Sequence, residues 1–288
     1  MTGADDGPRA GADPGAREDA PRPGRLYRLV VAVVFGLMGL LRWRVEVEGF
    51  EHVPLRGGTV LIANHLSYVD FFTVGRAPYE RLARPIRLLG KASLFRTPVL
   101  GTIMRAAEHI PVERGAGSHA FDAAVAALHR GELIGVLPEQ TISESLELLP
   151  FKTGAVRMAQ LAGAPLVPAV SWGTQRALPV YGPYRPAWRL PVLVAYGPAR
   201  VVPPDADPAA VTAALRDEMA AMLDRLQHRY PDGLPSGARW VPARLGGGAP
   251  TMAEAAAQLA ALEERWRERL DRRRRRGSDA RRDDGTTP

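Results

Sequence analysis

The chain has 288 residues, 46% of them apolar, which is enough for one sizeable α/β domain with appendages or for two small domains. It contains no cysteine, which excludes a disulfide framework, a cysteine-rich zinc site and a thiol nucleophile. The formal charge of +7 and the isoelectric point near 10.2 favour an acidic partner, but they do not distinguish among nucleic acid, an anionic membrane face and a phosphorylated substrate.

The first 44 residues divide into two segments of different character. Residues 1–24 are Gly, Ala, Pro and Asp with little to bury, so they are predicted to form a disordered tail, and no signal peptide is visible there. Leu29 to Leu41 are thirteen residues without a polar side chain, which as a helix would cover about 20 Å of a hydrocarbon layer of about 30 Å. Residues 25–44 are therefore predicted to be a membrane-associating helix inserted from one leaflet, and a buried core helix is the alternative.

Seven short apolar runs follow, separated by connectors long enough for crossovers. They are residues 44–49, 57–63, 86–90, 108–112, 132–138, 164–172 and 190–197. This alternation predicts an α/β fold with a mixed, mainly parallel seven-stranded sheet flanked by helices. In such sheets the strand ends are where chemistry is found.

The rest of the chain is predicted from composition. Residues 45–231 form one domain that ends in a helix over 207–230, and residues 232–250 form a Gly/Pro-rich linker. Residues 251–288 form an Ala-rich helix and a basic tail that contains Arg272 to Arg276. This arginine run is interpreted first as a solvated tail, second as a binder of anionic lipid headgroups, and last as a nucleic-acid contact, because no nucleic-acid-binding motif accompanies it.

The stretch NHLSYVD follows the second apolar run. If His65 lies in the turn that leaves the strand and a helix begins near Ser67, the side chain of Asp70 can reach back to the imidazole. A neutral imidazole accepts a proton at neutral pH, and a carboxylate on its second nitrogen fixes the tautomer. Such a pair activates a substrate hydroxyl. The alternative is structural, because Ser67 and Asp70 also have the spacing of a helix capping box.

Four further segments lie downstream, within or next to predicted strands. Their order and spacing make the combination far more specific than any single segment. The segments are KASLF at 91–95, IPVERG at 110–115, VLPEQT at 136–141 and PLVPAV at 165–170. Together with NHLSYVD they resemble the sequence blocks of the glycerophospholipid (1-acylglycerol-3-phosphate) acyltransferase family, over about residues 40–200.

The resemblance implies an enzyme of phospholipid biosynthesis at the cytoplasmic face of a membrane. His65 would be the general base that takes a proton from a hydroxyl of lysophosphatidic acid or a related lyso-lipid, and Asp70 would orient it. The acyl donor would be acyl-CoA or acyl carrier protein, so the expected partners are these donors, the lyso-lipid acceptor and membrane lipids, and nucleic acid is not expected. No metal, no cofactor and no covalent enzyme intermediate are implied.

The resemblance also assigns substrate-binding residues. Lys91 and Arg114 would hold the phosphate of the acceptor, and Glu139 would bind the acceptor or shape the site. Asn64 and Thr141, in the first and third blocks, are included in this substrate-binding set. On composition alone, the lysine and the arginine are ordinary exposed charges and the glutamate an ordinary turn residue.

Two positions depart from the family pattern. The third block of the family reads E-G-T-R, and this chain has Gln140 where the glycine is expected and Ile142 where the arginine is expected. Isoleucine cannot replace a guanidinium as a phosphate ligand. Lys152 and Arg157 in the nearby stretch FKTGAVR could compensate, or they could lie on the solvent face of the helix that begins at Gly154.

Three functions therefore remain open. The first is acyl transfer to lysophosphatidic acid or a related lyso-lipid. The second is O-acyl transfer to an acceptor without a phosphomonoester, such as an aminolipid or a glycolipid, which Ile142 would permit. The third is a catalytically degenerate relative that binds lipid at a membrane, and the intact His65 and Asp70 spacing argues against it.

Overall fold

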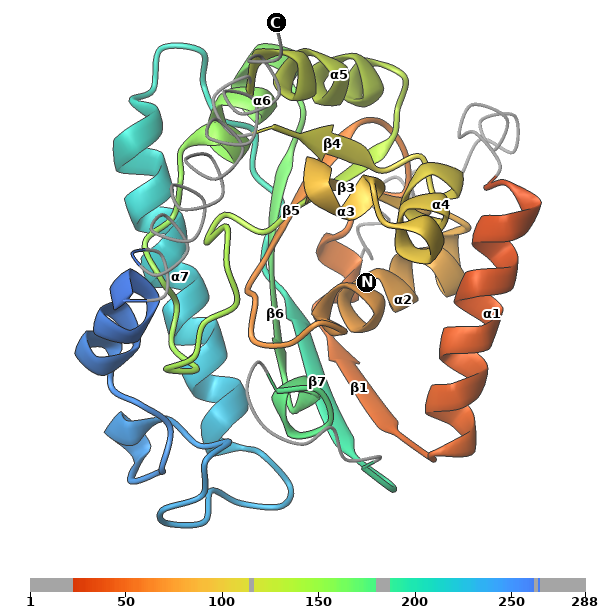
Figure 1. Cartoon of the computed structure of the whole chain (residues 1–288). Coiled ribbons are helices and arrows are strands. Elements are labelled where there is room, and N and C mark those ends of the chain that lie inside the picture. The colour runs from red at the N-terminus through yellow and green to blue at the C-terminus, as the bar shows by residue number, and fades with distance from the viewer. Residues whose placement is uncertain (1–22, 114–116, 180–186, 262–263, 265–288) are drawn as a thin grey trace, which may run out of the picture.

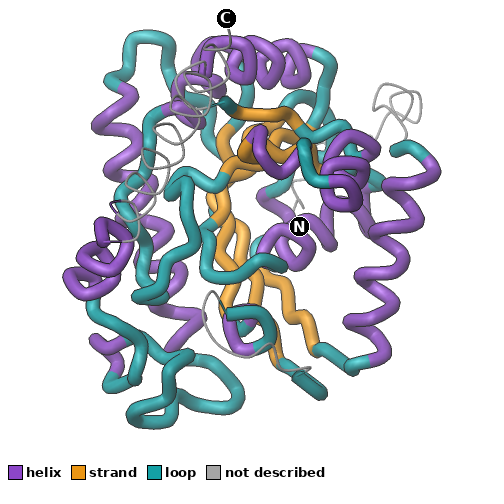
Figure 2. The backbone as a smooth tube through the Cα atoms, viewed as in Figure 1, coloured by secondary structure: helices purple, strands orange, loops and turns teal. Residues whose placement is uncertain are grey.

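The computed structural model describes residues 23–113, 117–179, 187–261 and 264 (Figures 1 and 2). The α-helices are α1 (Arg25–Leu40), α2 (Asp70–Leu82), α3 (Ala92–Phe95), α4 (Pro98–Ala106), α5 (Gly117–His129), α6 (Gly154–Ala162) and α7 (Pro208–His228). The strands are β1 (Arg44–Glu48), β2 (Thr59–Ala63), β3 (Ile86–Lys91), β4 (Ile110–Val112), β5 (Leu133–Val136), β6 (Leu166–Trp172) and β7 (Pro191–Tyr196). Short 3-10 helices are η2 (Phe50–His52), η3 (Thr174–Arg176) and η4 (Ala243–Leu245).

The seven strands form one sheet in the order β1-β7-β6-β2-β5-β3-β4. Every pairing is parallel except β6 with β7. The predicted mixed, mainly parallel sheet is therefore confirmed. Strands β2 to β6 all run in one direction, so the loops that follow them meet at the same edge of the sheet.

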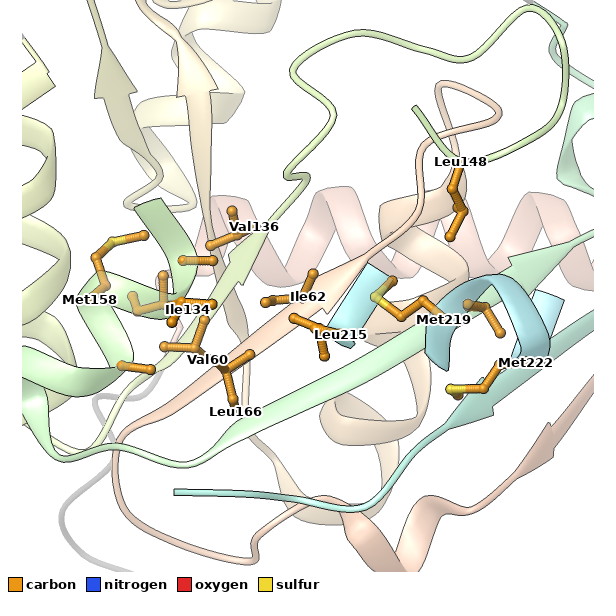
Figure 3. Close-up of a cluster of buried hydrophobic side chains, with 14 of the residues drawn as sticks. Val60, Ile62, Ile134, Val136, Leu148, Met158, Leu166, Leu215, Met219 and Met222 are labelled. Atoms are coloured by element: carbon orange, nitrogen blue, oxygen red, sulfur yellow. The ribbon is translucent and has the colours of Figure 1, made fainter. Parts of the chain in front are cut away.

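Helices cover both faces of the sheet (Figure 1). On one face α5, α6 and α7 pack against β2, β5 and β6, and Figure 3 shows Val60, Ile62 and Ile134 of the strands meeting Met158 and Leu215 of the helices. On the other face the buried residues Leu61, Leu133 and Val167 contact α2. Strands β2, β5, β6 and β7 are buried on both sides and become continuous apolar runs, which explains why these four were recognisable in the sequence.

Helix α1 lies outside α2 and α4, with only Val31 and Met38 fully buried. Tyr27 and Phe35 make edge contacts with Tyr79 of α2. Its other face carries exposed large side chains at helical spacing: Leu26, Leu29, Val33, Leu37 and Leu40. Within the described part of the chain, every helix is too short or too polar to cross a membrane. The association of α1 with a membrane stays a prediction.

The predicted tail and linker differ in how much of them can be described. Residues 1–22, most of the predicted tail, and the arginine run lie outside the described residues. Residues 252–261 are helical. The segment 232–250 is more than a connector, because it folds back on the domain and buries Val241 completely. Because the segment is rich in glycine and polar residues, its packing against the domain could not be predicted from composition.

Candidate active site

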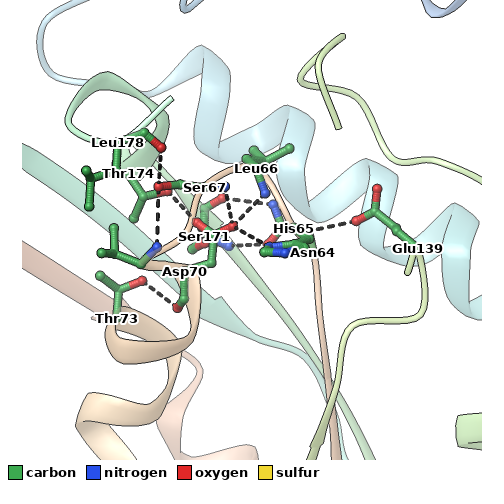
Figure 4. Close-up of polar contacts among 11 residues, drawn as sticks. Asn64, His65, Leu66, Ser67, Asp70, Thr73, Glu139, Ser171, Thr174 and Leu178 are labelled. Carbon is green, nitrogen blue, oxygen red and sulfur yellow. Dashed lines mark hydrogen bonds and ion pairs between the residues drawn. The ribbon is translucent and has the colours of Figure 1, made fainter. Parts of the chain in front are cut away.

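His65 and Asp70 lie together at the edge of the sheet where the parallel strands end. His65 follows β2 in an irregular turn, and Asp70 is the first residue of α2. The histidine Nδ1 lies 3.4 Å from the Asp70 Oδ2 atom (Figure 4). The helix begins three residues later than predicted, and the carboxylate still reaches back to the ring.

Asp70 is completely buried and is the centre of the turn. Its Oδ2 accepts hydrogen bonds from the backbone N–H groups of Leu66, at 2.5 Å, and Ser67, at 2.7 Å. Its Oδ1 accepts from the hydroxyls of Thr174, at 2.5 Å, and Ser171, at 3.3 Å. Asp70 accepts the N–H of Ser67 as a capping box would, although α2 begins at Asp70 itself, so this side chain has a structural role in the turn. Its role in orienting His65 stays a prediction.

The ring of His65 has one nitrogen available for chemistry. Because Nδ1 faces a carboxylate, we assign the proton to Nδ1, which leaves Nε2 as the acceptor. Among the described residues Nε2 makes no hydrogen bond, and the side chain of His65 is 19% exposed. An oriented imidazole with a free Nε2 can remove a proton from an alcohol that approaches from solvent.

Asn64 fixes the strand from which this turn leaves. Its amide is fully buried, donates to the backbone oxygen of Ser171 at 3.0 Å and accepts from the N–H of the same residue at 2.8 Å. Both polar atoms of the side chain are thus used within the protein. This geometry favours a positioning role for Asn64, tying the end of β2 to β6, over the substrate contact that was predicted from sequence.

Glu139 contacts the histidine turn on the side away from Asp70 (Figure 4). Its Oε1 accepts from the backbone N–H of His65 at 2.9 Å, and its Oε2 accepts from the N–H of Leu149 at 2.9 Å. Burial raises the pKa of this carboxyl to about 8, against the opposing effect of the two N–H donors. The side chain therefore joins the histidine turn to the loop after β5.

The raised pKa of Glu139 gives a pH-dependent stability. Below about pH 4.5 the carboxyl is protonated in both the folded and the unfolded chain, and between about 4.5 and 8 only the unfolded chain releases the proton. We expect the contribution of Glu139 to the free energy of unfolding to fall as the pH rises through this window, and then to level off. Chemical denaturation at pH 5, 6, 7 and 8 should show a flatter dependence for Glu139→Gln than for the wild type. Glu144→Gln, in the same loop, is the control and should retain the wild-type slope.

An open cleft of about 680 Å³ lies beside this turn, at the ends of β3, β4 and β5. Lys91, at the end of β3, and Lys152, just before α6, both line it, and both are exposed. Pro138 and Gln140, the neighbours of Glu139, form part of the wall. His65 is not among the lining residues; the loop of Pro138 to Gln140 borders the cleft and contacts the histidine turn through the bond from the His65 N–H to Glu139.

The remaining predicted residues fall in different places. Arg114 lies outside the described residues. Thr141 and Ile142 are half-buried in the loop after β5, and the structure gives neither a contact in the cleft. Arg157 is exposed and stacks over the ring of Phe121, so of the two basic residues in FKTGAVR only Lys152 faces the cleft.

Sequence reasoning missed Ser171 and Thr174, the two hydroxyls that contact Asp70. Ser171 is the second-last residue of the predicted strand 164–172, and Thr174 follows Gly173 immediately after that strand. A small polar residue within an apolar strand was the available signal, because a buried hydroxyl needs a partner. In the described residues no group of three or more His, Cys, Asp or Glu side chains is arranged to hold a metal ion.

Comparison with known proteins places this arrangement in context. Residues 44–172 match the acyltransferase family. The 1-acyl-sn-glycerol-3-phosphate acyltransferase of Bacillus subtilis (strain 168) is 34% identical over 136 residues, 46% of this chain and 65% of that protein. The protein of the same name from Limnanthes alba is 32% identical over 162 residues, 54% of each chain. The chain thus spans less than two thirds of the length of these relatives.

A solved structure shares the fold. The 1-acyl-sn-glycerophosphate (LPA) acyltransferase, PlsC, from Thermotoga maritima superposes with a TM-score of 0.56 over 71% of this chain and 82% of that chain, at 21% sequence identity. The matched family region contains Asn64, His65, Asp70 and Glu139. It ends at Trp172, before Thr174.

Proposed function

We propose that the protein transfers a fatty acyl group from a thioester donor to a hydroxyl of a lyso-lipid, because residues 44–172 of this chain match the acyltransferase family. The donor is acyl-CoA or acyl carrier protein, and the preferred acceptor is lysophosphatidic acid or a related lyso-lipid, as in phospholipid biosynthesis. The observation that carries the proposal is the His65 ring, held at Nδ1 by a buried carboxylate while Nε2 is free.

In the proposed reaction His65 acts as a general base. Its Nε2 takes the proton of the acceptor hydroxyl as that oxygen attacks the carbonyl carbon of the thioester. The new C–O bond forms, the C–S bond breaks, and the imidazolium returns the proton to the departing thiolate. The products are an ester and a free thiol. Asp70 stabilises the imidazolium and keeps the ring oriented.

Lys91 and Lys152 are proposed to bind the phosphate of the acceptor. The chain has two lysines among its 38 basic residues, and both line the cleft beside the histidine turn. Thr153 and Gly154 begin α6 at the same wall, and Thr153 does not cap the helix with its side chain, so backbone N–H groups are available there. Two ammonium groups and a helix N-terminus suit a phosphomonoester.

The acceptor is tested with the purified protein, labelled acyl-CoA and a panel of lyso-lipids with and without a phosphomonoester. We expect preference for the phosphomonoester. Lys152→Ala should raise the KM for that acceptor about tenfold with a smaller change in kcat, because the lysine binds the ground state and the transition state alike. Lys152→Arg keeps the charge and is the matched control.

A second candidate function follows from Ile142, which stands where the family pattern has an arginine. If lyso-lipids with and without a phosphomonoester react equally well, and Lys152→Ala behaves as the wild type does, the acceptor is an aminolipid or a glycolipid hydroxyl. Transfer to no acceptor, together with retained binding of lipid, would support the degenerate relative.

Helix α1 is proposed to attach the protein to the membrane that holds its substrates. The exposed side chains Leu29 and Val33 are each 60% exposed on its outer face. A single aspartate in an inserted apolar face is costly, so Leu29→Asp with Val33→Asp should abolish sedimentation with anionic phospholipid vesicles. The matched control pair is Leu161→Asp with Val201→Asp, since these residues are 63% and 65% exposed elsewhere on the surface. Equal sedimentation of both double variants would contradict this role of α1.

A further inference from the structure

The two oxygens of Asp70 are held by different parts of the chain. Oδ2 faces the histidine turn itself, where it accepts the N–H groups of Leu66 and Ser67. Oδ1 faces the turn after β6 and accepts the hydroxyl of Thr174 at 2.5 Å, with Ser171 more distant at 3.3 Å. Thr174 is fully buried. The rotation of the carboxylate, and with it the approach of Oδ2 to His65, therefore depends on where Thr174 lies.

Residues 173–178 form a tight turn that is built around this contact. Gly173 has a φ of +112°, and a Cβ there would lie 2.4 Å from the backbone oxygen of Pro191, so only glycine fits. The side chain of Gln175 accepts the N–H of Gly173 at 2.9 Å. At the far end of the turn, Leu178 accepts the hydroxyl of Ser67 at 2.9 Å. The turn thus contacts the catalytic turn at Asp70 and again at Ser67 (Figure 4).

The C-terminal segment holds this turn from outside. Arg176 donates to the hydroxyl of Tyr230 at 3.0 Å and forms an ion pair with Asp232. Its guanidinium lies over the ring of Trp240, 4.4 Å from the centroid. Gln175 donates to the backbone oxygen of Trp240 at 3.3 Å. We name Arg176, Tyr230, Asp232 and Trp240 the arginine clamp. A planar guanidinium suits it, because the group stacks on an aromatic face while it donates in its own plane.

We propose that Thr174 is a positioning residue for the catalytic pair and that the arginine clamp makes this position depend on the C-terminal segment. The proposal rests on the proposed function of His65 and Asp70. Residues 174–178 and 230–240 lie beyond the region that matches the acyltransferase family, so this support belongs to the part of the chain that the family match does not cover. Thr174 is fully buried and its hydroxyl donates to Asp70, so it acts on His65 through Asp70.

The first test compares Thr174→Val with Thr174→Ser. Valine keeps the shape and removes the donor, so kcat should fall about tenfold to 100-fold with KM close to wild type, since a small misplacement of a catalytic group costs this much. Serine keeps the hydroxyl and should restore kcat to within about threefold. A second measurement does not depend on activity. The ¹⁵N chemical shift of His65 Nδ1, assigned in the full-length protein with His65→Gln, should move in Thr174→Val and return in Thr174→Ser.

The second test compares Arg176→Lys with Arg229→Lys. Arg229 also forms two ion pairs, with Glu46 at 3.2 Å and Glu48 at 3.0 Å, but touches no residue of the 173–178 turn. We expect Arg176→Lys to lower kcat and to shift the His65 resonance in the direction of Thr174→Val, and Arg229→Lys to do neither. Identical behaviour of the two lysine variants would overturn the role of the clamp.

The outcomes separate this inference from the proposed function. Wild-type kcat and an unmoved His65 resonance in Thr174→Val overturn the positioning role, whatever the acceptor is. A wild-type protein that transfers no acyl group overturns the proposed function, and the resonance shifts still decide whether Thr174 orients the pair.

Discussion

Replacing His65 by alanine is expected to lower kcat for acyl transfer by about 100-fold to 10,000-fold, the usual contribution of a general base. The fold should survive, because the structural bonds of this residue are made by its backbone. The N–H of His65 donates to Glu139 at 2.9 Å, and its backbone oxygen accepts the N–H of Ser143 at 2.8 Å. Alanine keeps both. The measurement is release of free thiol from acyl-CoA in the presence of acceptor, with the melting temperature measured by circular dichroism.

His52 provides the matched control. It is also half-buried, and its Nδ1 makes one hydrogen bond, at 3.0 Å to the backbone oxygen of Tyr196. Because β1 runs opposite to β2, His52 lies at the other edge of the sheet from His65. His52→Ala should retain wild-type kcat. If His65→Ala kept more than about a tenth of the wild-type kcat, the general-base assignment would be wrong.

The features that could be predicted from the sequence are those encoded by neighbouring residues. Strands β2, β5, β6 and β7 are buried along their whole length and are continuous apolar runs in the sequence. Strands β1, β3 and β4 are partly exposed, and they too were found as short runs. The pairing of His65 with Asp70 follows from a strand, a short turn and a helix within a few residues. The turn geometry also predicted that the carboxylate reaches backward, although the helix begins at Asp70 rather than near Ser67.

The rest of the site depends on contacts between distant parts of the chain. Thr174 and Ser171 reach Asp70 across more than 100 positions, and no local pattern connects them. Glu139 was expected to bind the acceptor or to shape the site, and in the structure both of its oxygens accept backbone N–H groups. These contacts form because the loops after β6 and β5 lie on either side of the loop after β2. They can be predicted only when the strand order β6-β2-β5 is known.

That strand order also explains why both lysines line the cleft, while the position of Arg157 in α6 directs it elsewhere. Lys91 ends β3, and Lys152 follows β5 with its backbone N–H bound to the oxygen of Pro138, so both stand where adjacent parallel strands end. Arg157 is one turn further into α6 and turns toward Phe121 of α5. Lys152 is thus a candidate phosphate ligand, whereas Arg157, five residues later, makes a surface contact.

Asp70→Asn is expected to lower kcat by about 10,000-fold, as large an effect as the loss of the base itself, because a neutral amide does not stabilise an imidazolium. The fold should largely persist. The amide oxygen can accept the N–H groups of Leu66 and Ser67, and the amide nitrogen can donate to the hydroxyls of Thr174 and Ser171, which also accept hydrogen bonds.

Asp70→Ala separates the two roles of this carboxylate, because it removes the charge and every hydrogen bond together. Five donors would lose their acceptor: the Nδ1–H of His65 and the four buried donors of Leu66, Ser67, Ser171 and Thr174. The cost is about 1–3 kcal/mol for each buried donor left unsatisfied. We therefore expect the alanine variant to be inactive and strongly destabilised in urea denaturation, and the asparagine variant to be inactive with a modest loss of stability. An asparagine variant with near wild-type kcat would mean that Asp70 only builds the turn, and that the charge next to His65 plays no part in proton transfer.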